Sequence, residues 1–427
     1  MESGAASQPL LWVPRVLLFP LYFGSEFLVR RPLGALLTLD EKDHWQQRFY
    51  DFLTFGAHRQ FRIFPTGRVD LGLRPSAGVL ITWKDIVAAS DLRLRAVTGG
   101  SRWWALDSVW RAPLAQRSEL AVQLAISRRT DQAFYGFGPL SDGTPWHYEE
   151  QRQDLRLSYG QRLPPSSHLI LYVDQRWASF DPGAASSDES SLSEAIAAAR
   201  SPAPPALAGG LLVLATGAKI QLDTRGPRLT ENPKTSADFQ HRSGTGVGLE
   251  ARLEQAAGLR ATRAAASDAP RTPHWLDYGA SLLGSLDLTG TQRRLDLELL
   301  AAFTDGLPES NPVPFSEQVS LGGAKPLRGF RDHRLVDRSA AVATLSYRWP
   351  IGVSFDGALH YAVGNVFGEH LEGFAARLLR SSFGLGVDSA GSPDNPLEIL
   401  LAFGTKPFEA GGGIESVRLV FGTRAGF

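Results

Sequence analysis

The residues best suited to polar chemistry lie in one segment, "SLGGAKPLRGFRDHRLVDRS" at 320–339. Arg328 and Gly329 stand between the apolar residues Leu327 and Phe330, after a glycine pair and before a run of charges. An arginine guanidinium presents a planar fork of donors that matches a carboxylate, and a glycine lets the backbone turn tightly. We therefore expect an ion-paired contact here, between two stretches that have the pattern of strands.

Reactive groups are scarce elsewhere in the chain. There is no cysteine, which excludes disulfides, a thiolate nucleophile and a cysteine-based metal site. The sequence contains no G-x-S-x-G, H-E-x-x-H, G-x-x-x-x-G-K-[ST] or G-x-G-x-x-G motif. His333, beside Asp332, and His360 could titrate near neutral pH, but an isolated polar histidine is more often a hydrogen-bonding residue. The sequence favours a protein that is not an enzyme and that needs neither metal nor cofactor.

Composition and hydropathy narrow the class further. The 44 basic residues balance 44 acidic ones, so net charge does not indicate nucleic acid as a partner. The most apolar segment, at 13–39, is interrupted by Pro14, Pro20 and Pro32 and by four charged residues, which a spanning helix does not tolerate. The start, "MESGAASQPLLW", also has no basic stretch followed by an apolar run, so no leader peptide is recognised in this chain.

From about residue 60 onward, apolar and polar residues alternate with a period of two. Near the end of the chain, for example, Val417, Leu419 and Phe421 alternate with polar residues such as Arg418. A large soluble β protein also alternates, but its strands average about five or six residues. Transmembrane strands need about nine to eleven, apolar outward and polar inward, with aromatic residues near the interfaces. The long alternating segments therefore favour a transmembrane β-barrel, with belts that include Tyr347, Trp349, Phe421 and Phe427.

The pattern predicts an all-β fold, a sixteen-stranded antiparallel barrel. The expected strands are 59–66, 77–84, 91–98, 103–111, 118–128, 151–163, 167–180, 210–222, 243–256, 273–287, 291–304, 338–349, 353–367, 375–389, 396–406 and 414–427. An even number places both chain ends on one side of the membrane. The longest links, 129–150, 181–209 and 305–337, then share the opposite side.

Two regions lie outside this regular pattern. Residues 1–58 are rich in aromatic residues and are predicted to be a helical periplasmic or interfacial segment, so the barrel domain is expected at 59–427. The link 181–209 is small, polar and proline-rich, and it is predicted to be exposed and mobile, with a short helix at 191–200.

Five other short stretches, besides the Leu-Arg-Gly-Phe tetrad at 327–330, have distinctive sequences. They are "FYGFGP" (134–139), "LSYRWPIG" (345–352), "VGNVF" (363–367), "SSFGLGVDSAGSPDNPL" (381–397) and "VFGTRAGF" (420–427). Together, these motifs resemble the BamA/TamA superfamily of outer-membrane barrels, also known as the bacterial surface antigen family. Members of this family usually carry periplasmic POTRA modules. Only about 58 residues precede the expected barrel here, so the chain resembles a POTRA-less member.

The resemblance implies a barrel in the bacterial outer membrane whose first and last strands pair poorly and can open laterally. It also implies that the loop at 305–337 folds into the lumen with its tetrad. The end of the chain resembles the signal that the barrel-assembly machinery reads during biogenesis, which would include Leu419, Phe421, Gly422 and Phe427.

The family places two inward carboxylates opposite its loop arginine, and both are missing from this sequence. Ser346 and Ala362 stand at the corresponding positions. An arginine inside a lumen needs a counter-charge or dense hydrogen bonding, because its desolvation is otherwise uncompensated. Arg328 should therefore have found another partner.

We predict Asp356 as that partner. If the short link 350–352 pairs Trp349 with Val353, Asp356 lies across from Ser346 and points inward. Two other inward carboxylates serve as alternative partners, Asp388 and Glu398.

The resemblance implies an insertase or translocase-like barrel that assists the membrane insertion or passage of proteins or lipids. Its partners would be outer-membrane lipid, the assembly machinery, and client proteins or lipids, with no nucleic acid. The alternative is a passive or structural outer-membrane barrel, a plugged channel without insertase activity. The sequence leaves both functions open.

Overall fold

A computed structural model gives the structure of the chain. It describes residues 51–423 except 57, 88, 165, 184–189, 226–243, 261–271, 289–292, 309–311, 325, 352–354 and 390–396. The chain divides into two compact units, Met1–Arg59 and Gln60–Phe427. The helices predicted within 1–58 lie almost entirely outside the described residues, and the described part of the first unit includes the short strand β1 (Thr54–Phe55).

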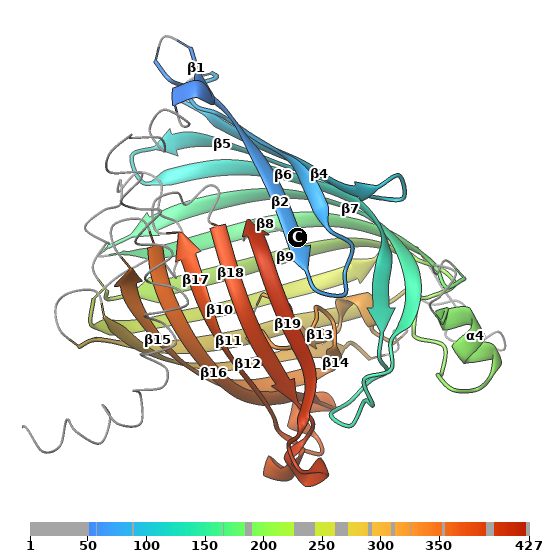
Figure 1. The fold of residues 1–427 in the computed structure, drawn as a ribbon. Helices are drawn as coiled ribbons and strands as arrows, with labels where there is room; N and C mark the ends of the chain where they lie inside the picture. Colours follow the sequence, from blue (N-terminus) through green and yellow to red (C-terminus); the bar gives the residue numbers. More distant parts are fainter. Residues whose placement is uncertain are drawn as a thin grey trace, which may run out of the picture. The chain divides into compact units, whose positions relative to one another are not determined.

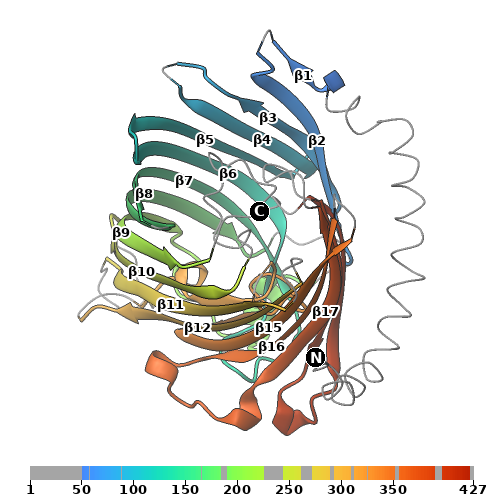
Figure 2. The same ribbon diagram turned by 90° about the vertical axis from the view of Figure 1, so that its left-hand side faces the viewer.

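The second unit is a closed antiparallel barrel of sixteen strands, which confirms the predicted fold (Figures 1 and 2). Each strand pairs with the next along the chain, β12 pairs with β15, and β19 pairs with β2 to close the ring. The strands are β2 (Phe61–Asp70), β3 (Ser76–Trp83), β4 (Asp91–Gly100), β5 (Trp103–Ala115), β6 (Ser118–Phe134), β7 (Trp146–Leu163), β8 (Ser167–Asp181), β9 (Leu211–Asp223), β10 (Gly246–Gly258), β11 (His274–Asp287), β12 (Arg294–Gly306), β15 (Ser339–Ile351), β16 (Phe355–Phe367), β17 (Arg380–Ser389), β18 (Leu397–Thr405) and β19 (Ile414–Thr423).

The alternation in the sequence separates a lipid-facing surface from a polar interior. On β19, Val417, Leu419 and Phe421 are each about half exposed on the outer surface, whereas Arg418 and Val420 are buried inside. Successive side chains of a strand point to opposite faces, so one residue in two meets lipid along each strand. Among the described residues, no helix is long and apolar enough to cross a membrane.

Among the described residues, the ladder that closes the barrel is the shortest in the ring. In the described residues, β19 and β2 align over three residue pairs, which run from Val420–Asp70 to Gly422–Arg68. The shortest other neighbouring pairs, β3–β4 and β17–β18, align over seven. Gly422 has a φ of +149°, and a Cβ there would lie 2.2 Å from the carbonyl oxygen of Gly67. We call this β2–β19 contact the seam.

Three of the long connections lie at one end of the barrel, as the sequence predicted, whereas the link between β9 and β10, at 224–245, lies at the other end. The links 135–145, 182–210 and 307–338 all follow strands that run toward the first end, which we call the loop end. Strand β2 starts at the other end and β19 finishes there, and we call it the turn end.

The link after β8 departs from the prediction that it is exposed. Its helix α4 (Leu192–Ala197) forms within the predicted stretch and begins with a capping box between Ser191 and Glu194. Leu192 and Leu207 are buried, in a cluster with Phe134 and other aromatic residues of β6 to β8. Apolar burial against the strands therefore holds the ends of this link at the barrel.

The hairpin between β15 and β16 has a different register from the predicted one. Residues 350 and 351 continue β15, so the short link does not begin at Pro350. Trp349 lies across from Gly357, where a Cβ would approach its ring to 2.3 Å, and Ser346 lies across from His360. A bulky tryptophan opposite a glycine is one reason for this register, and Asp356 is displaced from Ser346 as a result.

The two ends of the barrel should lie on opposite faces of the membrane. An epitope inserted after Gly373, in the loop-end link between β16 and β17, should be reached from one side only, and an epitope after Phe427 from the other. Antibody labelling of intact and permeabilised cells that express each tagged protein measures this. Labelling of both tags on intact cells would contradict the strand assignment.

Candidate functional site

The segment singled out in the sequence lies inside the barrel. It belongs to the inserted loop, which we define as residues 307–338 between β12 and β15. Two short strands, β13 (Val319–Leu321) and β14 (Leu335–Asp337), pair within it. The segment between them, residues 322–334, contains the tetrad 327–330, and we call it the excursion.

Apolar residues fix this excursion to the barrel wall. Leu327 and Phe330 are fully buried in a cluster formed with β13, β14 and the inner faces of β12, β15 and β16. Ala362, which stands where the family has an aspartate, belongs to the same cluster. An apolar contact therefore occupies the place of the missing carboxylate.

Arg328 forms an ion pair with Glu398 of β18, one of the two alternative partners named from the sequence. Both side chains are buried, and Arg68 of β2 lies 3.8 Å from the same carboxylate. Asp388 lies 3.6 Å from Arg348. The reasoning that led to Asp356 was wrong in its register, because Asp356 lies across from Pro350.

Gly329 brings the loop backbone against the barrel wall. Its N–H donates to the Ser382 hydroxyl at 2.7 Å, and its carbonyl accepts from the Ser416 hydroxyl at 2.6 Å. A Cβ at this position would lie 2.1 Å from the carbonyl oxygen of Phe403. Only glycine fits this approach without displacing the backbone of β18.

Arg418 of β19 joins the inserted loop to the seam. One of its terminal nitrogens donates to the carbonyls of Gly323, Arg328 and Phe330, at 2.6, 3.0 and 3.2 Å. The other donates to the carboxylate of Asp70 on β2. Sequence reasoning assigned Arg418 to the polar face but gave it no role; its position inside an apolar strand was the available signal.

Two of the remaining motifs meet beside this site. Asn365, in "VGNVF", donates to the carbonyl of Pro139, in "FYGFGP", at 3.1 Å. Glu415 of β19 accepts from Arg334 of the inserted loop and from Arg380 of β17. These contacts bring stretches that are far apart in the sequence to one side of the inserted loop.

A second anchor holds the inserted loop to the other side of the lumen. Glu317, in the short helix η3 (Phe315–Glu317), pairs with Arg152 of β7 and Arg176 of β8, each at 2.9 Å. Burial opposes the ionisation of Glu317, but the two guanidinium groups outweigh it and lower its pKa below the usual 4.5. We call these three residues the Glu317 anchor.

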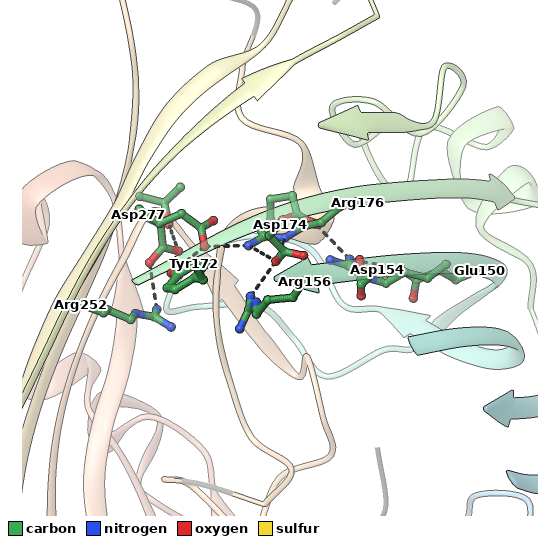
Figure 3. A network of polar contacts seen from close by, with 12 residues as sticks. Glu150, Asp154, Arg156, Tyr172, Asp174, Arg176, Arg252 and Asp277 are labelled. Atoms are coloured by element: carbon green, nitrogen blue, oxygen red, sulfur yellow. Dashed lines mark hydrogen bonds and ion pairs between the residues drawn. The ribbon is translucent and has the colours of Figure 1, made fainter. Parts of the chain in front are cut away.

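The Glu317 anchor belongs to an extended network of charges on the inner faces of β7, β8, β10 and β11 (Figure 3). Arg176 also binds Glu254 and Asp174, and Asp174 accepts from Arg156 at 2.6 Å. Alternating acids and bases compensate one another, which lets many charges share a barrel interior.

Phe315 reinforces the same anchor. Its ring lies among Phe134, Tyr148 and Phe180, with ring centroids 4.8 to 5.9 Å apart. The strands of the two anchors, β8 and β18, stand eight places apart in the ring of sixteen. The inserted loop therefore crosses the lumen between opposite walls.

Comparison with known proteins agrees with this geometry. Residues 274–424, which include β11 to β19 and the inserted loop, match the model of the Omp85 superfamily domain. The match confirms the family resemblance read from the motifs.

Two of the solved structures that are similar to this chain are outer-membrane barrels named BamA and CdiB. The crystal structure of BamA from Haemophilus ducreyi lacking POTRA domains 1–3 has a TM-score of 0.55 and 13% identity, over 85% of this chain and 70% of that one. CdiB from Acinetobacter baumannii has a TM-score of 0.49 and 10% identity, over 85% of this chain and 59% of that one. No curated protein sequence matches this chain. The likeness to BamA concerns the fold.

Three residues of the predicted assembly signal lie at or beside the seam. Leu419 and Phe421 face outward on β19, and Gly422 makes the close approach to β2. Phe427 lies outside the described residues, so its role in an assembly signal stays a prediction.

Arg328→Ala and Glu398→Ala should each expose the excursion 322–334 to trypsin, because removal of one partner leaves the other charge buried without compensation, at a cost of roughly 3–5 kcal/mol. The double variant should be no more sensitive than the worse single one. Cleavage rates of the barrel in detergent measure this. Asp107→Ala, which removes a lumen carboxylate paired with Arg95, is the matched control. Additive sensitivities would contradict the pair.

The Glu317 anchor should fail in acid. Because the pKa of Glu317 is lowered in the folded protein, its stabilisation is present above about pH 4.5 and lost as the pH falls through the folded pKa. Glu317→Gln should produce the same loosening at neutral pH. Current fluctuations in planar bilayers at pH 7 and at lower pH measure loop movement. Glu250→Gln, which changes an acid paired with Lys219 on the barrel wall, should not increase the current fluctuations at pH 7. Unchanged current fluctuations in Glu317→Gln would contradict the role of the Glu317 anchor.

Proposed function

We propose that this protein is an outer-membrane barrel that assists the membrane insertion or translocation of proteins, with the seam as its working part. The observation that carries the proposal is that, among the described residues, β19 and β2 align over three pairs, in a ring whose other neighbours align over seven or more. The Omp85 superfamily domain at 274–424 includes one side of that seam.

The physical basis is the cost of placing strand backbone in hydrocarbon. Each unpaired backbone N–H or C=O in a bilayer costs several kcal/mol, so a client strand crosses more readily beside an edge that supplies partners. A weakly closed seam supplies such an edge when it opens. The reaction involves no covalent step, only an exchange of backbone hydrogen bonds between the barrel's own strands and a client strand.

The seam geometry also suggests where the client would first be held. The outward faces of β2 and β19 are apolar, with Val69 and Phe421 directly opposite each other and about half exposed. An incoming amphipathic strand could continue this apolar surface while its backbone pairs with the edge. The loop end would face the exterior, and the turn end the periplasm.

One observation favours the alternative of a passive or structural barrel. The inserted loop is held at two opposite walls, by Arg328 and Glu398 and by the Glu317 anchor, so it obstructs the lumen without requiring any client. The two functions differ in whether opening of the seam matters, and a covalent lock on the seam separates them.

Val69→Cys/Phe421→Cys should allow a disulfide across the seam, in a chain that has no other cysteine. Oxidation should abolish any acceleration of client insertion, and a reductant should restore it. Insertion of an eight-stranded outer-membrane barrel into liposomes that contain the protein measures this rate.

The matched control is Phe383→Cys/Phe403→Cys, an opposed outward pair within the longer β17–β18 ladder. Its disulfide should leave insertion unchanged. A wild-type protein that gives no acceleration would favour the passive barrel, and equal loss in both locked variants would show that the seam is not the working part.

A further inference from the structure

Pro65 occupies β2, one of the two strands that form the seam. Strand β2 pairs with β3 along one side, where Pro65 lies across from Val79. On its other side, the described pairing with β19 extends from Asp70 to Arg68. The ring of Pro65 is exposed on the outer face, in the same row as Val69. The question is which edge of β2 loses a donor at Pro65.

Two backbone hydrogen bonds give the answer. In an antiparallel pair, residues alternate between those that bond one neighbouring strand and those that bond the other. Lys84 N–H donates to the carbonyl of Gln60 at 2.8 Å, so the even-numbered residues of β2 direct their backbone groups toward β3. Leu71 N–H donates to the carbonyl of Leu419 at 3.0 Å, so the odd-numbered residues direct theirs toward β19.

Pro65 is odd-numbered, and its nitrogen therefore points to the seam. Proline has no N–H, so a strand lying along this edge meets no donor at that position. A strand along this edge would present a carbonyl there, and a polar group left unpaired within a membrane is costly. Pro65 is three residues beyond Arg68, on the turn-end side of the described seam contact.

The loop-end side of the seam has the opposite character. There the guanidinium of Arg418 binds Asp70 across the two strands and is itself held by carbonyls of the inserted loop. A charged, buried contact thus reinforces one side, and a missing donor weakens the other.

We propose that Pro65 keeps the turn-end part of the seam weak, so that the barrel opens there first and a client strand that pairs with β2 is bound loosely enough to leave. The inference rests on the proposed function for its client. The geometric part, a seam weakened by Pro65, stands independently of it. A proline at this edge would limit both re-closure by β19 and capture by a client, which favours exchange over trapping.

The test is Pro65→Ala, which restores the donor. Hydrogen exchange of the seam amides of Val69, Leu419 and Phe421 in liposomes should slow by about three- to tenfold, the factor expected for one net backbone hydrogen bond. Ile63→Pro, which removes the next seam-directed donor, should accelerate the same amides. Pro350→Ala, in β15 across from Asp356 of β16, is the matched control away from the seam and should leave them unchanged.

Unchanged exchange in Pro65→Ala would overturn the inference, whatever the wild-type protein does to client insertion. Slower exchange together with a wild-type protein that accelerates no insertion would support the weak seam and remove the proposed function. Slower exchange with reduced insertion by Pro65→Ala would support both. Equal slowing in Pro350→Ala would also overturn the inference, because the effect would then come from losing any proline.

Discussion

The barrel interior depends on one buried guanidinium, that of Arg418. An ion pair with Asp70 and hydrogen bonds to three loop carbonyls compensate its charge. A buried arginine is costly unless its donors find acceptors, so the inserted loop and the strand β2 both stabilise the same side chain. Seam closure and the position of the loop are thereby linked through one residue.

This link gives the inserted loop a role beyond filling space. If the excursion 322–334 leaves the wall, Arg418 loses three acceptors, and its hold on Asp70 must then support a less compensated charge. The Glu317 anchor on the opposite wall restrains the loop from that movement. A loop held at both walls can therefore stabilise a seam that has few backbone bonds of its own.

Period-two alternation was sufficient to predict all sixteen strands, because each long strand must present one face to lipid and one to a polar lumen. Which side chains form ion pairs was harder to predict from the sequence. The predicted partner of Arg328 depended on where one hairpin turned, and a single-strand pattern does not reveal that Trp349 needs a glycine opposite it. Glu398 was recognised only as an inward carboxylate, since strand order brings β18 to the loop but local sequence does not.

The seam illustrates why closure itself could not be predicted from the pattern. Asp70 and Arg418 are 348 positions apart in the chain, and each alone is an ordinary polar residue on an inward face. The effect of Pro65 likewise cannot be judged until it is known that the odd-numbered residues of β2 direct their backbone groups toward β19. On the edge of β2 that faces β19, the ion pair between Asp70 and Arg418 and the missing N–H of Pro65 lie a few residues apart. A seam built this way has a strong side and a weak side, so it is more readily unzipped from the turn end than broken all at once. Because Arg418 also binds carbonyls of the inserted loop, an opening that spreads from Pro65 toward Asp70 disturbs the loop last.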